Sequence, residues 1–371
     1  MRKFNGKKAG IICGVALASF TSYALLDTFV IPHPMQTVSG QNLEANGISL
    51  NEDESTEVQN AYADGENQDQ NYYADGKNQE QNTFSQENTS SDGFAQNNEN
   101  TENIDNSDEN SSNQSFGSSS GTSRSASGTV IGTYSDSESK ITLTQYRAYN
   151  SNIYVADVEV TEGTSILSAF ANNTYGRNIT DTTSNMAEEN NAVLAINGDY
   201  YGARQSGYVI RNGVVYRNQG NNGEDMVISK DGTLSFISES ETSTDSLIQN
   251  QAWQVLSFGP VLVENGQVAV SENDEVGMAM ASNPRTAIGT VAKNHYLFVV
   301  SDGRTSESAG LSLYELANFM KSLGATNVYN LDGGGSSTMV FQGEVVNNPT
   351  TNGNRISERA VSDILYIGKS S

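Results

Sequence analysis

The hydrophobic pattern divides the chain into three parts. An apolar stretch runs from Ala9 to about Ile31, polar residues dominate from Gln36 to Ser127, and regular alternation begins near Thr129. The last part, residues 128–371, is long enough to bury a sizeable core. We therefore predict one folded domain that follows an apolar segment and a polar linker.

Strand patterns dominate the last part. Alternating or clustered β-formers fill residues 141–149 and 152–160, and residues 295–301 read HYLFVVS, a run typical of a buried strand. Asn-Gly or Asp-Gly between apolar runs is the strongest short hairpin signal. Three such turns occur, at Asn212-Gly213, Asp231-Gly232 and Asn265-Gly266.

Helix patterns are fewer. Residues 312–323 begin with Ser312 and Glu315 in a capping-box spacing, carry an apolar face, and stop at Gly324. A second helix is predicted over about 182–190. Few helices and many hairpins favour an α+β domain, a mixed fold with a large and largely antiparallel β-sheet core.

The N-terminus has the pattern of a membrane segment. Its apolar stretch of about 20 residues can span a bilayer, and preceding positive charges favour a cytoplasmic N-terminus. We predict a cytoplasmic basic segment (1–8), a transmembrane signal-anchor (9–31), and a C-terminal domain outside a bacterial cell. A cleaved signal peptide is the alternative, because Ala16, Ala18 and Ser19 are small.

The polar segment 36–127 predicts a disordered stalk. It contains 17 acidic residues against Lys77 and Arg124, and large apolar residues are sparse. Two near-repeats, residues 60–70 and 71–81, are too few for a solenoid. Self-repulsion between the acids keeps such a chain extended, so we expect it to hold the folded domain away from the membrane.

Charge and rare residue types exclude several functions. The net charge of −24 argues against nucleic-acid binding. The single cysteine, Cys13, allows no disulfide within the chain, and two histidines, His33 and His295, exclude a multi-histidine metal site. Acid–base chemistry must therefore fall mainly on carboxylates.

The segment 327–341, NVYNLDGGGSSTMVF, is the first candidate for chemistry. Asp332 follows a strand-like run and precedes three glycines and two serines. Such a turn can expose backbone N–H groups to an anion, although a flexible loop is the simpler interpretation. The candidate residues here are Asp332, Gly333, Gly334, Gly335, Ser336 and Ser337.

Three further segments have the same arrangement, in which polar residues stand at a strand end. An acid beside an aromatic ring can bind a sugar, and an arginine beside a hydroxyl can clamp an anion. A further arginine precedes the last strand. The candidate residues are Asn197, Asp199, Tyr201, Arg285, Thr286, Asp302 and Arg359. Each alone could be a turn or surface residue, and the sequence cannot show that they converge.

Together these motifs resemble the phosphodiester glycosidase family over residues 190–368. The resemblance is carried by NGDYY, PRTAIG, SDGR with the helix that follows it, NLDGGGSSTMV and ERAVSD. One position departs from the expected pattern, since Asp199 stands where a second glycine is expected. This departure argues against a catalytic role for Asp199.

The resemblance implies hydrolysis of the glycosidic bond in sugar-1-phosphodiesters of the N-acetylglucosamine-1-phosphodiester type. We predict that Asp332 and Asp302 are catalytic and that Arg285, Arg359 and the glycine-loop N–H groups stabilise the phosphate. Bacterial members are associated with exopolysaccharide, so the expected partner is a sugar phosphodiester or an anionic wall glycan. No cofactor is required, although a carboxylate cluster could hold Ca²⁺.

Two alternatives stay open at this point. One is a non-catalytic surface protein that binds an anionic glycan such as teichoic acid with the same fold. The other is an enzyme acting on a different glycan linkage.

Overall fold

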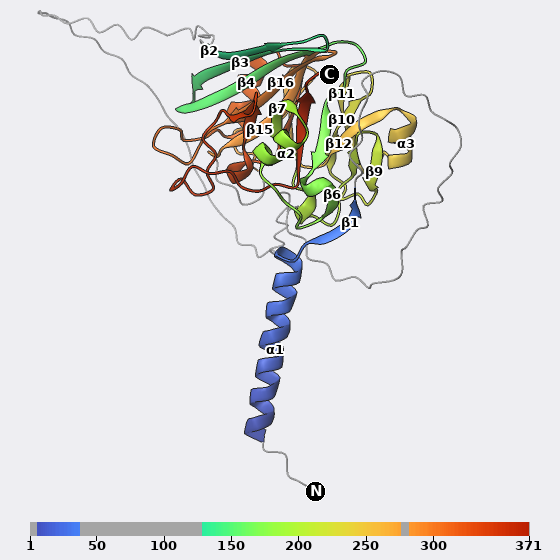
Figure 1. The fold of residues 1–371 in the computed structure, drawn as a ribbon, viewed down its shortest axis with the longest axis vertical. Coiled ribbons are helices and arrows are strands. Elements are labelled where there is room, and N and C mark those ends of the chain that lie inside the picture. The colour runs from blue at the N-terminus through green and yellow to red at the C-terminus, as the bar shows by residue number, and fades with distance from the viewer. Residues whose placement is uncertain (1–5, 38–127, 276–281, 371) are drawn as a thin grey trace, which may run out of the picture. The chain divides into compact units, whose positions relative to one another are not determined.

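The fold is built from antiparallel sheets with a few short helices. A computed structural model describes residues 6–37, 128–275 and 282–370 (Figure 1). Its strands lie in three larger sheets and one two-stranded sheet. The predicted α+β class with a largely antiparallel core is confirmed.

The largest sheet has eight strands in the order β14-β13-β17-β15-β16-β4-β3-β2. Strands β2, β3 and β4 lie side by side (Figure 1). In β3, Ile141 and Leu143 are buried and alternate with more exposed Lys140 and Thr142, as the period of a strand requires. The bounds are β2 (Thr129–Ser135), β3 (Ser139–Ala148), β4 (Ser151–Val160), β13 (Val261–Glu264), β14 (Gln267–Val268), β15 (Arg285–Ala292), β16 (His295–Ser301) and β17 (Asn327–Leu331).

Two five-stranded sheets accompany it, in the orders β19-β18-β7-β20-β5 and β11-β10-β12-β8-β9. The first contains β5 (Leu167–Phe170), β7 (Ala192–Asn197), β18 (Met339–Phe341), β19 (Glu344–Val345) and β20 (Asp363–Gly368). The second contains β8 (Val209–Arg211), β9 (Val214–Arg217), β10 (Glu224–Ser229), β11 (Leu234–Ser238) and β12 (Ala252–Leu256). The short sheet pairs β1 (His33–Thr37) with β6 (Thr174–Arg177).

One hydrophobic core joins the three larger sheets. Phe298 comes from the eight-stranded sheet, Ile196 from β7 and Leu256 from β12, and all three are fully buried in the same cluster. The other face of the eight-stranded sheet packs on α4 (Leu313–Ser322). Helix α2 (Thr183–Glu189) packs against the sheet that contains β7, and α3 (Thr244–Gln249) packs on the sheet that contains β12.

Most local predictions are confirmed. The three hairpins form at the predicted turns, where Asn212, Asn265 and the turn glycines adopt positive φ. The capping box of α4 is present: Ser312 Oγ accepts from Glu315 N at 3.1 Å, and Glu315 Oε2 accepts from Ser312 N at 2.9 Å. Helix α3 and strand β1, which covers the first two residues of the predicted stalk, were not anticipated.

The N-terminal predictions fare differently. Helix α1 (Gly6–Phe29) covers most of the apolar stretch. Within the part of the chain that the structure describes, no helix is long and apolar enough to cross a membrane, so the predicted anchor over 9–31 finds no support there. The rest of the predicted stalk, residues 38–127 with both repeats, lies outside the described residues.

A buried carboxyl group lies in strand β10, in the five-stranded sheet that also contains β12. Asp225 is fully buried beside the side chains of Ser257 and Glu239. Burial and the adjacent Glu239 raise the pKa of Asp225 to about 9. Glu239 accepts from the backbone N–H groups of Tyr208 at 2.8 Å and Gly223 at 3.1 Å.

Asp225→Asn is therefore expected to raise the free energy of unfolding at pH 8 by about 1–3 kcal/mol. A carboxyl whose folded-state pKa is raised costs stability as the pH climbs from its unfolded pKa near 4 towards about 9. In the variant, the free energy of unfolding should no longer fall with rising pH for this reason, as measured by urea unfolding between pH 5 and pH 9. Asp245→Asn, on the exposed side of α3, is the control. A loss of stability in Asp225→Asn at pH 8 would contradict the interpretation.

Candidate active site

Strand ends from two sheets meet at the predicted catalytic segment. In the register of the eight-stranded sheet, Thr286 pairs with Leu331, and Arg285 pairs with Ser301. The start of β15 and the ends of β16 and β17 therefore lie side by side. Asn197, the last residue of β7, reaches them from the other sheet.

Asn197 ties the two sheets together through its side chain. Its Nδ2 donates to the backbone carbonyl of Asp332 at 2.7 Å, and its Oδ1 accepts from Thr286 Oγ1 at 2.8 Å. All three residues are buried. The structure thus brings together three of the residues that the sequence placed at strand ends.

Asp332 is the carboxylate at the centre of this arrangement. Its side chain is 13% exposed, and its Oδ2 accepts from Arg359 Nη2 at 2.9 Å and from Ser336 Oγ at 2.5 Å. Arg359 Nε also donates to Ser336 Oγ at 2.9 Å. Burial raises the pKa of Asp332, and the charge of Arg359 opposes that rise.

Positive charge gathers around the glycine loop. Arg304 lies against Gly334, whose φ is +60°, since a β-carbon there would lie 2.9 Å from Arg304 Nη2. Arg304 donates to Asn283 Oδ1 at 2.9 Å and to the carbonyl of Thr351. Burial, and then the charges of Arg359 and Arg285, lower the pKa of Arg304, so the three guanidinium groups act on one another electrostatically.

The glycine loop itself is more closed than the sequence predicts. The N–H of Gly334 donates to the carbonyl of Pro284 at 2.8 Å. Those of Ser336 and Ser337 donate to the carbonyls of Gly333 and Gly334 in the short 3₁₀ turn of residues 334–336. These three N–H groups are occupied, and the charged groups beside the loop are arginine side chains.

Arg285 is more buried than its predicted role as an anion clamp requires. It is 3% exposed, its Nη2 donates to Glu275 Oε2 at 2.6 Å, and its Nε donates to the carbonyl of Leu311 at 2.9 Å. The charge of Arg285 contributes to the lowered pKa of Arg304. Gly335 has a packing role, because a β-carbon there would meet Thr351 at 2.5 Å.

Asp199 is part of a buried ion network. Its Oδ2 lies 3.0 Å from Arg211 Nη2, and Arg211 Nε lies 2.8 Å from Asp363 Oδ2. All three residues are at most 2% exposed. Asp199 also accepts from the backbone N–H groups of Tyr201 and Ser257 at 3.0 Å each. Asp199, which replaces the glycine expected in the family motif, is thus a structural partner of Arg211.

Tyr201 belongs to the core. It is 1% exposed, stacks on Tyr175 with ring centroids 5.3 Å apart, and meets Phe170 edge-on at 5.3 Å. A sugar cannot stack on a ring covered in this way. The neighbouring Tyr200 is 43% exposed.

Asp302 is buried beside a second loop. Its Oδ1 accepts from the backbone N–H of Asn348 at 2.7 Å, and its Oδ2 accepts from Asn348 Nδ2 at 3.2 Å. Burial raises the pKa of Asp302, and the bonds from Asn348 oppose that rise. Within the described residues, no hydrogen bond joins the carboxylates of Asp302 and Asp332.

The geometry fits the family that the motifs indicate. A family model described as phosphodiester glycosidase matches residues 190–368, which include Asn197, Thr286, Asp332 and Arg359. Residues 190–368 of this chain are similar to phosphodiester glycosidases. The resemblance drawn from the motifs is thereby confirmed.

Individual relatives match this chain over part of their length. The SPbeta prophage-derived uncharacterized protein YomE of Bacillus subtilis is 31% identical over 52% of this chain and 30% of its own. The human N-acetylglucosamine-1-phosphodiester alpha-N-acetylglucosaminidase is 33% identical over 33% of this chain and 26% of its own. The chain thus spans less than a third of either relative.

A solved structure shows the same fold. The catalytic domain of the zebrafish N-acetylglucosamine-1-phosphodiester alpha-N-acetylglucosaminidase, auto-inhibited by its pro-peptide, matches with a TM-score of 0.51. The match has 24% identity and covers 66% of this chain and 88% of that one. At this identity the likeness concerns the fold alone.

Two arginines within residues 190–368 lie beside this candidate site and were not predicted from the sequence. Arg304 follows Asp302 in the SDGR motif, and Arg204 lies three residues after Tyr201. Arg204 lowers the pKa of Asp332, donates to the carbonyl of Ser257 at 2.9 Å, and lies over the Phe258 ring. Their place inside motif segments was the available signal, but a lone arginine gives no direction in sequence.

Proposed function

We propose that this protein hydrolyses the glycosidic bond of sugar-1-phosphodiesters in cell-surface polysaccharide or wall polymer metabolism. The observation that carries the proposal is the pairing of Asp332 with Arg359 at the edge of an arginine-lined glycine loop, inside a region similar to phosphodiester glycosidases. The relatives' named activity supports the same substrate class.

On the phosphate side, Arg359 and Arg304 stabilise the leaving group. The Arg359 side chain is 38% exposed, and Arg304, from the segment after β16, is partly exposed beside the glycine loop. A guanidinium offers several N–H donors to phosphate oxygens. A phosphate monoester leaves readily, since its second pKa is about 6, so charge stabilisation replaces much of the protonation that a sugar alcohol would need.

On the sugar side, Asp332 acts at the anomeric carbon. As a carboxylate it either attacks that carbon directly or takes a proton from an attacking water. Ser336 holds the carboxylate through Oδ2, and Asn197 fixes the backbone of the same residue. The acid is thus positioned from both its side chain and its main chain.

The decisive experiment is turnover of an N-acetylglucosamine-1-phosphodiester, such as UDP-N-acetylglucosamine, by the full chain in ¹⁸O-labelled water. We expect free N-acetylglucosamine, and UDP without label, because cleavage at the anomeric carbon leaves the original glycosidic oxygen on the phosphate. Label in the phosphate would mean phosphorus–oxygen cleavage. Tight binding without turnover would favour an anionic-glycan binder, and turnover of neutral glycosides alone would favour another linkage.

The proposed location is the outer face of a bacterial membrane. It rests on the basic residues and the apolar stretch of residues 1–31 and on the acidic composition of residues 36–127. Fractionation of cells, with protease added outside intact cells, tests it. Recovery of the protease-protected chain in the cytosolic fraction would overturn this location.

Asp302→Asn separates a structural role of this acid from the predicted catalytic one. We expect kcat to stay within about tenfold, because Asp302 holds Asn348 and the variant keeps one acceptor oxygen. The free energy of unfolding should fall by about 1–2 kcal/mol, as one charge-assisted bond is lost. A loss of kcat near 10³-fold in a stably folded variant would instead make Asp302 catalytic.

A further inference from the structure

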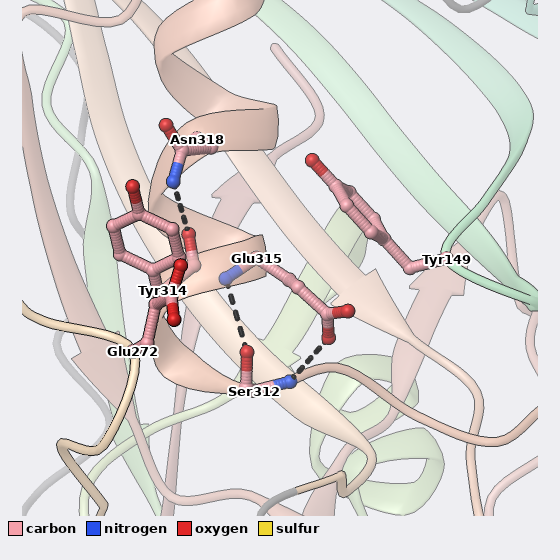
Figure 2. Close-up of a pocket in the computed structure, with 6 residues that line it drawn as sticks. All are labelled: Tyr149, Glu272, Ser312, Tyr314, Glu315 and Asn318. Atoms are coloured by element: carbon pink, nitrogen blue, oxygen red, sulfur yellow. Dashed lines mark hydrogen bonds between the residues drawn. The ribbon is translucent and has the colours of Figure 1, made fainter. Parts of the chain in front are cut away.

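A separate pocket lies at the start of α4. It has a volume of about 550 Å³, and Figure 2 shows the side chains around it. The lining residues come from the β3–β4 turn, the segment after β14 and the first turns of α4, and none of them belongs to the candidate active site. They are Tyr149, Glu272, Ser312, Tyr314, Glu315 and Asn318.

Two aromatic rings face this pocket because of local backbone structure. Tyr149 occupies the tight β3–β4 turn with a φ of 49°, and it is 41% exposed. Tyr314 lies in the first turn of α4, on the other side of Glu315 in Figure 2. Burial, and then Glu315 and Tyr314, raise the pKa of Tyr149, so the three side chains are electrostatic neighbours.

The polar groups of the pocket are acidic and preset. The capping box fixes Glu315 through Oε2, and Asn318 Nδ2 donates to the carbonyl of Tyr314 at 2.8 Å. Glu272 adds a second carboxylate, and none of the six lining residues is basic. The start of the helix carries a partial positive charge of about one half, which the two full carboxylate charges outweigh, so the pocket as a whole is negative and repels the phosphate that the candidate active site attracts.

We propose that this pocket binds an ammonium group carried by a small organic ligand. Aromatic faces attract ammonium ions, and adjacent carboxylates add to that attraction and determine the sign of the ligand's charge. A bare metal ion fits less well, because the described residues hold no group of three His, Cys, Asp or Glu able to bind one. The site is independent of the proposed hydrolysis.

The test compares each cation with a neutral ligand of the same shape, by isothermal titration and saturation-transfer NMR on the full chain. Glucosamine is paired with N-acetylglucosamine, and choline with 3,3-dimethyl-1-butanol. We expect saturable binding of at least one cation, at least about tenfold tighter than its neutral partner. Preference for glucosamine would identify an amino sugar as the carrier, and preference for choline a quaternary ammonium.

Substitutions in the pocket locate the binding. Tyr149→Leu and Glu272→Gln should each lower the affinity for the cation about fivefold or more. Tyr149→Phe keeps the ring and should change the affinity little. Glu315→Gln removes the charge while glutamine still suits the capping box. Glu162→Gln, an exposed acid in the turn after β4, is the control. Equal binding of the neutral partners, no binding of either cation, or full affinity in Tyr149→Leu would overturn the proposal.

Discussion

Replacing Asp332 with asparagine is expected to lower kcat for sugar-1-phosphodiester hydrolysis by about 10³-fold or more. Asparagine has the same size and its side-chain oxygen can still accept from Arg359 or Ser336, so the loop should keep its conformation. The amide cannot attack the anomeric carbon or take a proton from water. Release of N-acetylglucosamine from UDP-N-acetylglucosamine measures the effect.

The control for Asp332→Asn is Asp231→Asn, at an exposed hairpin turn, which should retain full activity. Substrate affinity should persist in Asp332→Asn, because the proposed phosphate contacts come from Arg359 and Arg304. An Asp332→Asn variant within tenfold of wild-type kcat would refute the assignment of this acid. A folded variant that has lost substrate binding as well would assign Asp332 to binding.

Replacing Arg211 with leucine is expected to lower the free energy of unfolding by about 3–5 kcal/mol at pH 8. Arg211 is 1% exposed and lies between Asp199 and Asp363. Without it, two carboxylates stay buried without a counter-charge. Urea unfolding followed by circular dichroism measures the loss.

The pH dependence of this loss checks its cause. Burial already raises the pKa of Asp363 to about 7, and Arg211 opposes that rise. Below pH 5 the folded variant can protonate its carboxyls at little cost, so the destabilisation should be smaller there and grow towards pH 8. The variant that also carries Asp199→Asn and Asp363→Asn should recover part of the stability. Arg355→Leu, on an exposed loop, is the control, and a pH-independent loss in Arg211→Leu would point to packing alone.

Local features of the fold could be predicted because neighbours in sequence determine them. The hairpin at Asn212-Gly213 and the capping box of Ser312 and Glu315 depend on residues at most three positions apart. Strand ends could be located for the same reason. The motif segments could therefore be found and matched to a family.

The roles of individual site residues depended on partners distant in sequence. Asp199 looked like a surface acid near a sugar, but Arg211 and Asp363 make it part of a buried network. Tyr201 looked like a stacking platform, but it packs with Phe170 and other rings in the core. No local pattern reports such contacts.

The sequence also could not predict which side chains come together at the glycine loop. The register between β15 and β17 brings Thr286 next to the residue before Asp332, although 46 positions separate Thr286 from Asp332 in the printed sequence. Arg304 lies near these residues because its guanidinium donates a hydrogen bond to Asn283 Oδ1. The sequence could name the segments but not the side chains that point inward.

The ion pair between Asp332 and Arg359 has a consequence for substrate choice. Each group balances the charge of the other across the 2.9 Å between Arg359 Nη2 and Asp332 Oδ2. We propose that a phosphodiester, through its own negative charge, competes with Asp332 for Arg359 as it binds and so frees the carboxylate to react. A neutral glycoside has no charge with which to do so. We therefore expect discrimination against neutral sugars to appear in kcat more than in KM, as selectivity exercised through activation of the acid.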